Sequence, residues 1–395
     1  MGSDKGCKAN YNVVSSPLTT EETISTKRRL TATLTTSPSV NVPVLPTIPF
    51  DLIPEILCRL SVKLLMQFRC VCKSWNSLIT DSKFAKNLLS FATARLVHSL
   101  AKSSDPLHNY VIKTYPLDSV FSDLTTHVIA QLEYHPNDHY VSFVGSCNGI
   151  ICLFKYYRGF PTLQLWNPSI RKFKELPPIE NQQNLRPVLR MYGFGYDVDT
   201  NNYKVLVVAH LLDSSGNFVG KHKVMVYTLG SNAWKSIQKF PIYSVVHQRG
   251  KFVSGTINWL VYKESQHCIA SFDLGNESSQ EVSLPDFGEV YPYPFRLGVL
   301  GDCLCMVFGH DVWVMKEYGN TRSWTKLFTI SYLPITYFII DVVNIFEENQ
   351  VLLKCREEYG TPKWIIYNSK NGTFEITQLE NTLQVCVESL ISPCC

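Results

Sequence analysis

The sequence contains no apolar run of about 18 residues, the length that a membrane-spanning helix needs. It also has little charge of one sign, because 37 basic and 33 acidic residues leave a net charge of +4 over 395 residues. Nucleic acids and anionic membranes attract concentrated positive charge, so neither is expected as a main partner. The first residues lack the apolar core of a secretory signal.

Complete catalytic motifs are missing as well. Gly193-x-Gly195 lacks the third glycine and the following helix of a dinucleotide-binding fingerprint, and no G-x-S-x-G elbow occurs. Thirteen cysteines, an odd number without an export signal, indicate reduced and mostly buried thiols. We therefore expect a protein of the cytoplasm or nucleus, without catalytic residues or a cofactor.

Two groups of residues resemble metal sites only in part. Asp197-x-Asp199-x-Asn201 begins like a calcium loop, but Asn202 and Val208 occupy the positions of the required Gly and Glu. This pattern predicts a turn stabilised by Asx side chains. A second group could be drawn as a zinc set, although its spacing fits no compact finger: His135, His139, Cys147 and Cys152. We expect no metal site.

The segment from Ile48 to Trp75 carries more apolar residues than an isolated helix pair needs. A first apolar stripe has helical spacing and consists of Leu52, Ile53, Ile56, Leu57 and Leu60. A second set follows directly and consists of Val62, Leu64, Leu65, Phe68, Val71 and Trp75. These helices must bury part of this surface against something else.

Helix boundaries can be placed from capping residues. Asp51 is expected to cap the first helix, with Pro54 in its first turn. Further helices are expected over 62–68, 73–79 and 84–89, the last one capped by Asp81 or Ser82. Residues 1–44 are rich in Ser, Thr and Pro without apolar periodicity, so we expect a disordered leader before a helical domain at 45–90.

After residue 90 the pattern changes to short β-branched and aromatic runs separated by turn residues. A strand–turn–strand unit recurs five times, and Trp166, Tyr227, Phe272, Met315 and Tyr367 mark equivalent positions at steps of 61, 45, 43 and 52 residues. About 40–50 residues make one four-stranded propeller blade. We therefore expect an α+β multidomain protein, with a small all-α domain and an all-β propeller of about six blades at 91–395.

The ring of blades is expected to close with strands from both ends of this region. Strands near 95–115 and the terminal run 385–391 remain after five blades are assigned, and pairing them would remove open edges. A β-sandwich or two smaller β domains is the alternative fold. A propeller closed in this way would not need the helices for its core, which leaves their apolar surface to a separate partner.

The helical segment resembles the F-box. The match includes Ile48-Pro49, Asp51-Leu52-Ile53, Glu55-Ile56-Leu57 and the run Phe68-Arg69-Cys70-Val71-Cys72-Lys73-Ser74-Trp75. Ser61 departs from the family pattern, where proline separates two helices. The β region resembles the plant F-box-associated, kelch-like domain at 147–153, 165–177 and 193–206.

This resemblance implies a substrate-recognition subunit of an SCF (Skp–cullin–F-box) ubiquitin ligase. The F-box would bind a Skp-type adaptor, which joins it to cullin and RING subunits, and the chain would not be an enzyme itself. The residues expected to contact the adaptor are Ile48, Pro49, Leu52, Ile56, Leu57, Leu60, Val62, Leu65, Phe68, Val71 and Trp75. Their surplus apolar surface is typical of an obligatory interface.

A target protein, not identified by the sequence, is expected to bind long, dissimilar loops at one face of the propeller. These loops are expected at 155–161, 178–190, 211–222, 241–250, 286–296 and 331–338. Tyr and Arg are favoured at protein interfaces, so the candidates are Tyr156, Arg158, Phe160, Arg186, Tyr243, Arg249, Tyr291, Tyr293 and Arg296.

Two other functions stay open from the sequence. Propellers also host enzymes, which would need carboxylates or metal ligands facing the central channel. An F-box protein can also act as a scaffold outside a ligase. Adaptor binding without ubiquitin transfer would identify the scaffold.

Overall fold

The computed structural model describes residues 49, 51–91, 95–102, 110–117, 130–134, 138–157, 160–179, 185–238, 240–241, 244–246, 248–264, 266–287, 295–330, 337–346, 349–357, 360–377 and 382–394. The expected leader over 1–44 lies outside these residues. No helix in the described ranges is long and apolar enough to cross a membrane.

Four helices form one helical block: α1 (Leu52–Leu57), α2 (Val62–Phe68), α3 (Lys73–Thr80) and α4 (Ser82–Phe91). Asp81 caps α4 as expected, because its Oδ1 accepts hydrogen bonds from the Lys83 and Phe84 amides. The expected cap at Asp51 is wrong: its backbone is already helical and its side chain makes no capping bond. Ser61 instead caps α2, so a side-chain oxygen stands where a rigid proline was expected.

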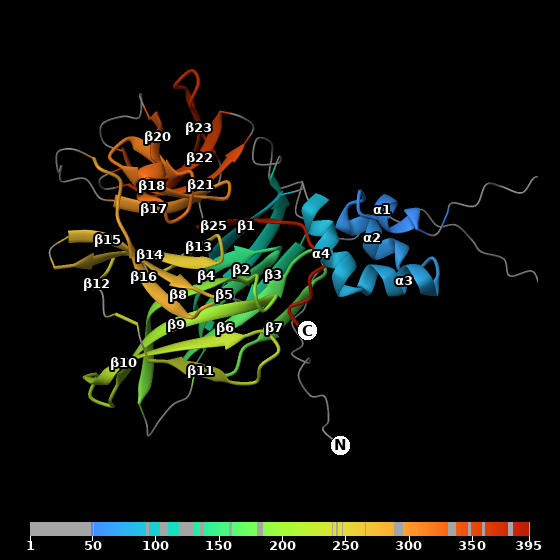
Figure 1. Cartoon of the computed structure of the whole chain (residues 1–395), viewed down its shortest axis with the longest axis horizontal. Coiled ribbons are helices and arrows are strands. Elements are labelled where there is room, and N and C mark those ends of the chain that lie inside the picture. Colours follow the sequence, from blue (N-terminus) through green and yellow to red (C-terminus); the bar gives the residue numbers. More distant parts are fainter. Residues whose placement is uncertain are drawn as a thin grey trace, which may run out of the picture.

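The β region is a six-bladed propeller, as the repeat predicted (Figure 1). The first blade comprises β25 (Thr382–Val387), β1 (Arg95–Lys102), β2 (Tyr110–Pro116) and β3 (Ala130–Tyr134). The second comprises β4 (Asp138–Cys147), β5 (Ile150–Tyr157), β6 (Phe160–Asn167) and β7 (Lys172–Glu175). The third comprises β8 (Arg186–Asp197), β9 (Asn202–Leu212), β10 (Phe218–Thr228) and β11 (Trp234–Ile237).

The fourth blade comprises β12 (Ser244–Val245), β13 (Lys251–Val253), β14 (Thr256–Lys263), β15 (Gln266–Asp273) and β16 (Ser278–Val282). The fifth comprises β17 (Phe295–Leu300), β18 (Cys303–Phe308), β19 (Asp311–Met315) and β20 (Trp324–Thr329), the last preceded by the short 3-10 helix η3 (Thr321–Ser323). The sixth comprises β21 (Tyr337–Phe346), β22 (Gln350–Glu357), β23 (Lys363–Asn368) and β24 (Phe374–Ile376). Neighbouring strands within each blade are antiparallel, and a single parallel pair, Val299 with Val343, joins the last two blades.

The ring closes as predicted, by antiparallel pairing of the C-terminal strand β25 with β1. At this junction the buried His98 imidazole contacts Thr114 Oγ1 of β2 at 2.9 Å and Cys386 Sγ of β25 at 2.9 Å. Both ring nitrogens therefore have partners without an added proton. Complete burial lowers the pKa of His98 to about 3, so the imidazole is neutral.

The segment after β25 is held by two motifs that lie far from it in sequence. Asn167, fully buried, donates to the carbonyls of Ser389 at 3.0 Å and Ile391 at 2.8 Å. Gly149, at φ +79°, packs so closely that an added Cβ would stand 2.4 Å from Ser389 Cβ. The turn at Gly149 and the Asn167-Pro168 corner therefore form a socket for the C-terminal tail.

The helical block and the propeller share one hydrophobic core. Leu57, Leu65 and Leu88 belong to the same cluster of buried side chains as Leu390 and Ile391 of the tail. Figure 1 shows α4 beside the propeller, with α1–α3 farther out. The expectation that the propeller leaves the helices entirely to a separate partner is therefore wrong, because its own tail and blades cover one face of them.

The segment that began like a calcium loop is an Asx turn, as predicted. Asp197 Oδ1 accepts from the Asp199 amide at 3.0 Å, and its Oδ2 pairs with Lys204 Nζ at 2.8 Å. Burial alone would raise the pKa of Asp197, but hydrogen bonds from Lys204 and Thr200 outweigh it and hold the pKa below its ordinary value. The carboxylate therefore serves the turn between β8 and β9.

The neutral state of His98 predicts a pH-dependent stability. Because its folded pKa lies below its ordinary value of 6.5, folding excludes a proton, and stability is lost as pH falls below 6.5. Between pH 7 and pH 5 this residue should cost about 2 kcal/mol of unfolding free energy. The unfolding free energy, measured by urea unfolding at pH 7 and at pH 5, should fall between these pH values by about 2 kcal/mol less in His98→Gln than in the unsubstituted chain. Equal losses would contradict the assignment.

Candidate functional site

The first candidate site is the outer surface of the helical block. Leu52 and Ile56 are each 45% exposed and lie one turn apart on α1. Val71, between α2 and α3, is 60% exposed, and Pro49 is exposed before α1. Apolar side chains so placed are available to a partner.

Other residues expected at the adaptor interface have different surroundings. Leu57, Val62 and Leu65 are buried in the chain's own core and present no surface to a partner in this conformation. Their helical spacing is the same as that of the exposed residues, so periodicity alone could not separate the two faces. Ile48 lies outside the described residues.

The remaining members of the set are half-buried. Leu60, Phe68 and Trp75 pack against the shared core, and the Phe68 and Trp75 rings meet edge to face with centroids 5.4 Å apart. Leu64, which was not among the expected contacts, is 40% exposed on α2. We call Leu52, Ile56, Leu64 and Val71 the exposed apolar row.

The second candidate site lies at the end of the propeller where the connections between blades run. Several expected loops there are hairpin strands: β5 and β6 leave only residues 158–159 between them, and β9 and β10 leave only 213–217. The expected loops at 155–161 and 211–222 are therefore wrong. Tyr156, Phe160 and Arg186 lie in strand ends, where backbone pairing fixes their positions.

Aromatic side chains link several of the expected target-binding residues. The Tyr156 ring lies 6.4 Å from Tyr140 and 5.0 Å from Phe154, and the Phe154 ring stacks on Tyr192 at 5.4 Å. Tyr192 in turn forms side-chain hydrogen bonds with Arg249 and with Ser142. We call Tyr140, Phe154, Tyr156 and Tyr192 the aromatic array.

Burial raises the pKa of the Tyr192 phenol in the array. Burial raises the pKa of Tyr156, against the positive charge of Arg186, which lowers it. This electrostatic effect places Arg186 near Tyr156, although the two belong to neighbouring blades. Phe160 is exposed at the tip of the same hairpin. Arg158, Tyr243, Tyr291 and Tyr293 lie outside the described residues.

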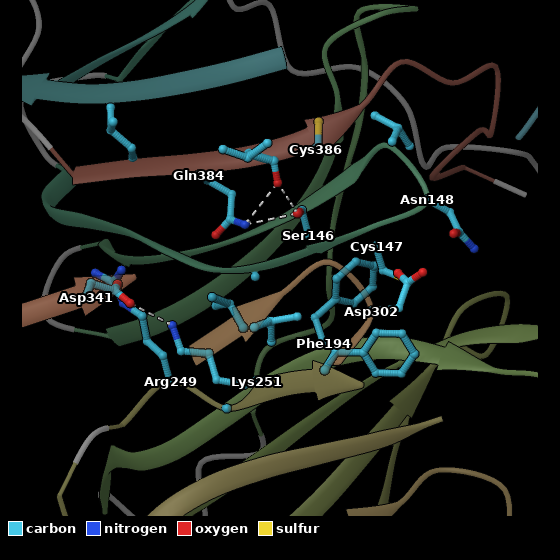
Figure 2. Close-up of a pocket in the computed structure, with 18 of the residues that line it drawn as sticks. Ser146, Cys147, Asn148, Phe194, Arg249, Lys251, Asp302, Asp341, Gln384 and Cys386 are labelled. Carbon is cyan, nitrogen blue, oxygen red and sulfur yellow. Dashed lines mark hydrogen bonds and ion pairs between the residues drawn. The ribbon is translucent and has the colours of Figure 1, made fainter. Parts of the chain in front are cut away.

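The central channel contains a cavity of about 410 Å³ (Figure 2). Its lining runs from Arg249, Lys251 and Asp341 at mid-depth to the turns at Asn148 and Asp302. Those turns join the first and second strands of their blades, so the cavity reaches the face opposite the inter-blade connections. Arg249 lies in the connection between β12 and β13, within the expected loop at 241–250, and it also lines this cavity.

Arg296 was expected in a loop but is a strand residue. It lies in β17, and burial lowers the pKa of its guanidinium, with Asp341 opposing the shift and Arg356 adding to it. Lys251, Asp341 and Lys354 of the same region were not among the candidates. Their signal was available in the sequence, because Asp341 and Lys354 interrupt apolar strands.

The described residues contain no group of three or more His, Cys, Asp or Glu side chains arranged to hold a metal ion. Burial raises the pKa of the Cys147 thiol to about 12, which keeps it protonated and unreactive near neutral pH. His135 and the side chain of His139 lie outside the described part of the chain.

Two family models together match nearly all of the described chain. The F-box domain matches residues 45–87, and the F-box associated beta propeller domain matches residues 107–393. This chain is an F-box protein with an F-box-associated β-propeller. Its helical block is the F-box, and the tail socket at Gly149 and Asn167 belongs to the propeller.

Relatives of this F-box protein occur in Arabidopsis thaliana. F-box/kelch-repeat protein At3g23880 is 30% identical over 88% of this chain and 96% of its own length. F-box protein CPR1 is 30% identical over 72% of this chain and 73% of its own length. Among solved structures, TolB from Acinetobacter baumannii aligns with a TM-score of 0.43 and 12% identity over 78% of this chain and 70% of that one. Similarity at that level adds nothing to the assignment.

The two faces of the F-box helices can be separated by stability. Leu65→Ala removes a side chain from the shared core, so it should lower the unfolding free energy by about 2–5 kcal/mol. Leu64→Ala, its neighbour in the exposed apolar row, should cost less than about 1 kcal/mol because little buried contact is lost. Urea unfolding of both variants tests the assignment, and similar losses would contradict it.

Proposed function

We propose that this F-box protein is the substrate-recognition subunit of an SCF ubiquitin ligase. Its F-box would bind a Skp-type adaptor and, through it, the cullin and RING subunits. The observation that carries the proposal is the exposure of Leu52 and Ile56 on α1. The opposite face of the same helices is already covered by the chain's own core, so this row is the apolar surface left for a partner.

The size of the exposed apolar row sets what it can contribute. Complete burial of a Leu or Ile side chain gives about 1.5–3 kcal/mol, and these side chains are already about half buried. Four of them therefore supply about 3–6 kcal/mol, whereas micromolar binding needs about 8 kcal/mol. Polar and backbone contacts of the F-box must supply the remainder.

The propeller supports the second half of the proposal. The aromatic array and Arg186 lie at the end where the blades are connected, whereas the F-box packs at the opposite end, beside the turns near Gly149 and Asn201. A target protein held by the array would not compete with an adaptor for the same surface. In this role the chain positions its target and other subunits perform the chemistry.

Two alternatives predict different observations. An enzyme would turn over a substrate without any other subunit, and Asp341, a carboxylate facing the channel, would be the first residue to test. However, Asp341 already pairs with Lys251 at 3.3 Å. A scaffold would bind the adaptor and the target, but the reconstituted complex would not transfer ubiquitin to that target.

Adaptor binding should depend on the exposed apolar row. Leu52→Asp combined with Ile56→Asp places two charges in the proposed interface, where they would lose hydration without gaining partners. Pull-down of a plant Skp-type adaptor by the full-length chain should fall at least about a hundredfold, which corresponds to about 2.7 kcal/mol.

The matched control is Leu327→Asp with Ile376→Asp, two residues of similar exposure on outer propeller strands. This control should bind the adaptor as well as the unsubstituted chain. Circular dichroism melting of both double variants verifies folding. Undiminished adaptor capture by a folded Leu52→Asp/Ile56→Asp chain would overturn the proposal.

The same double variant should stabilise targets in plant cells. Deleting the F-box would expose core residues of the propeller, so the full-length Leu52→Asp/Ile56→Asp chain is the better tool. Proximity labelling should recover proteins whose abundance rises severalfold with this variant, and adding Tyr156→Ala, Phe160→Ala and Arg186→Ala should reduce their labelling. Labelling unaffected by the alanines would show that the target does not bind the surface formed by Tyr156, Phe160 and Arg186.

A further inference from the structure

The third blade carries a basic surface at the end of the propeller where the blades are connected. Residues 186–190 of β8 and residues 210–223, where β9 turns into β10, contain four Lys or Arg residues and one carboxylate. The four cations are Arg186, Arg190, Lys221 and Lys223. The carboxylate, Asp213, closes the turn of its own hairpin, because its Oδ1 accepts from the Ser215 and Asn217 amides at 2.9 Å. Positive charge therefore predominates at this end of the blade.

Four other blades neutralise a lysine at the same end of the propeller with a carboxylate from another of their own strands. The pairs, in the second, fourth, fifth and sixth blades, are Lys155 with Glu175 at 2.8 Å, Lys263 with Glu281 at 2.7 Å, Lys326 with Asp311 at 2.9 Å and Lys363 with Glu357 at 3.9 Å.

The third blade places its ion pairs differently. Lys204 and Lys235 pair with Asp197 and Glu277, which lie toward the opposite end of the propeller. Neither Arg190 nor Lys221 forms an ion pair with a carboxylate of the described residues. The basic surface of this blade therefore lacks the internal neutralisation that the other four blades have.

An exposed aromatic ring lies among these cations. Phe218 is 57% exposed, and the Arg190 guanidinium carbon lies 5.3 Å from the centre of its ring. Leu212 pairs with both Arg186 and Phe218 in the strand register, so these three residues form one row on one face of the blade. A guanidinium stacked on a ring keeps its N–H groups directed along its edge, so Arg190 can contact Phe218 and bind a carboxylate together.

Two imidazoles extend the same surface. The His210 ring meets the Phe218 ring edge to face with centroids 5.1 Å apart, and it lies 6.1 Å from the His222 ring. Burial lowers the pKa of His210, and the charges of Arg190 and His222 lower it further. This effect agrees with the excess of positive charge in the sequence of the hairpin. We call Arg186, Arg190, Phe218 and Lys221 the blade-three basic patch.

We infer that the blade-three basic patch binds an acidic peptide segment that also carries an aromatic or large apolar side chain. Carboxylates of the segment would form the ion pairs that the other blades make internally, and its apolar side chain would cover the Phe218 ring. The patch includes Arg186, so it continues the surface proposed above for the target. As a statement about the target protein, the inference rests on that proposed function.

Other occupants fit the patch less well. The chain's own residues 1–44 contain five Lys or Arg and three Asp or Glu, so their net charge has the same sign as the patch. Proteins that bind DNA often contact about six to ten phosphates, more than four cations can reach. Val219, 38% exposed beside Phe218, adds apolar surface that a peptide side chain can cover.

Fluorescence anisotropy with the full-length chain and a labelled peptide tests the inference. The probe is a peptide of about ten residues with Glu and Asp on both sides of one Trp, and its matched control carries Gln and Asn instead. The acidic peptide should saturate at micromolar concentration in low salt and bind at least about tenfold more weakly in about 300 mM salt, since salt screens exposed charges.

Three outcomes of this titration would overturn the inference. These are equal affinity for the acidic and amide peptides, no binding of the acidic peptide up to about 1 mM, and tighter binding of a single-stranded oligonucleotide of equal charge. The last outcome would assign the patch to nucleic acid.

Variants locate the binding. Arg190→Gln combined with Lys221→Gln should weaken the acidic peptide at least about tenfold, because two cations that can pair with its carboxylates are removed. The matched control is Lys326→Gln, since Lys326 also lies over an aromatic ring, Trp313 at 5.9 Å, but pairs with Asp311. Unchanged binding in the double variant, or an equal loss in the control, would contradict the site.

Reversed charges give a test of opposite sign. Arg190→Glu combined with Lys221→Glu should lose the acidic peptide and gain affinity for the same peptide with Lys in place of Glu and Asp. Damage to the fold would cause loss without gain, and circular dichroism melting verifies folding. A folded variant that gains no affinity for the basic peptide would count against the patch.

The peptide and adaptor measurements fail separately. The Arg190→Gln/Lys221→Gln chain should capture the adaptor normally, because β9 and β10 lie on the side of the propeller away from the helical block (Figure 1). The Leu52→Asp/Ile56→Asp chain should bind the acidic peptide normally. Absent peptide binding with intact adaptor capture overturns this inference alone, whereas absent adaptor capture with intact peptide binding overturns only the ligase function.

Discussion

Closure of the propeller by its C-terminal strand is the constraint on which the rest of the structure depends. β25, the last strand of the chain, pairs with β1, the first strand of the β region, although almost the whole β region separates them in sequence. The pairing buries His98 against Cys386. The chain then continues into the tail, where Asn167 holds Ser389 and Ile391. Because a closed ring leaves no open edge at this position, the first and last strands stabilise each other.

The same closure fixes the position of the F-box. Leu390 and Ile391 join the cluster that contains Leu57 and Leu65, and the Val62 amide donates a hydrogen bond to the Glu388 carboxylate. The F-box helices are therefore packed against the propeller and do not hang from a flexible linker. A rigid connection of this kind would hold a target bound to the propeller at a defined distance from a partner bound to the F-box. Such an arrangement matters only if the propeller and the F-box bind their partners at the same time.

Local patterns in the sequence were sufficient for the elements and for the fold. The repeat of strand–turn–strand units predicted the blades, because strand and turn patterns depend on residues adjacent in the chain. The closing pair was predicted because one apolar run at each end of the β region remained after five blades had been assigned. The loops were predicted less well. Residues 155–161 and 211–222 carry polar and aromatic residues, so composition could not show that strand pairing reaches into both ends of these ranges.

The sequence by itself determined the family, the blade number and the set of apolar residues that the F-box helices must bury, since these follow from residue type and spacing. Only the tertiary structure decided which face of each helix is covered. Leu64 and Leu65 are chemically identical neighbours, and packing against the tail buries one and leaves the other exposed. The wall of the channel cavity was also hidden in the sequence, because Arg249 and Asp341 are far apart in the chain and line one cavity only when the ring closes.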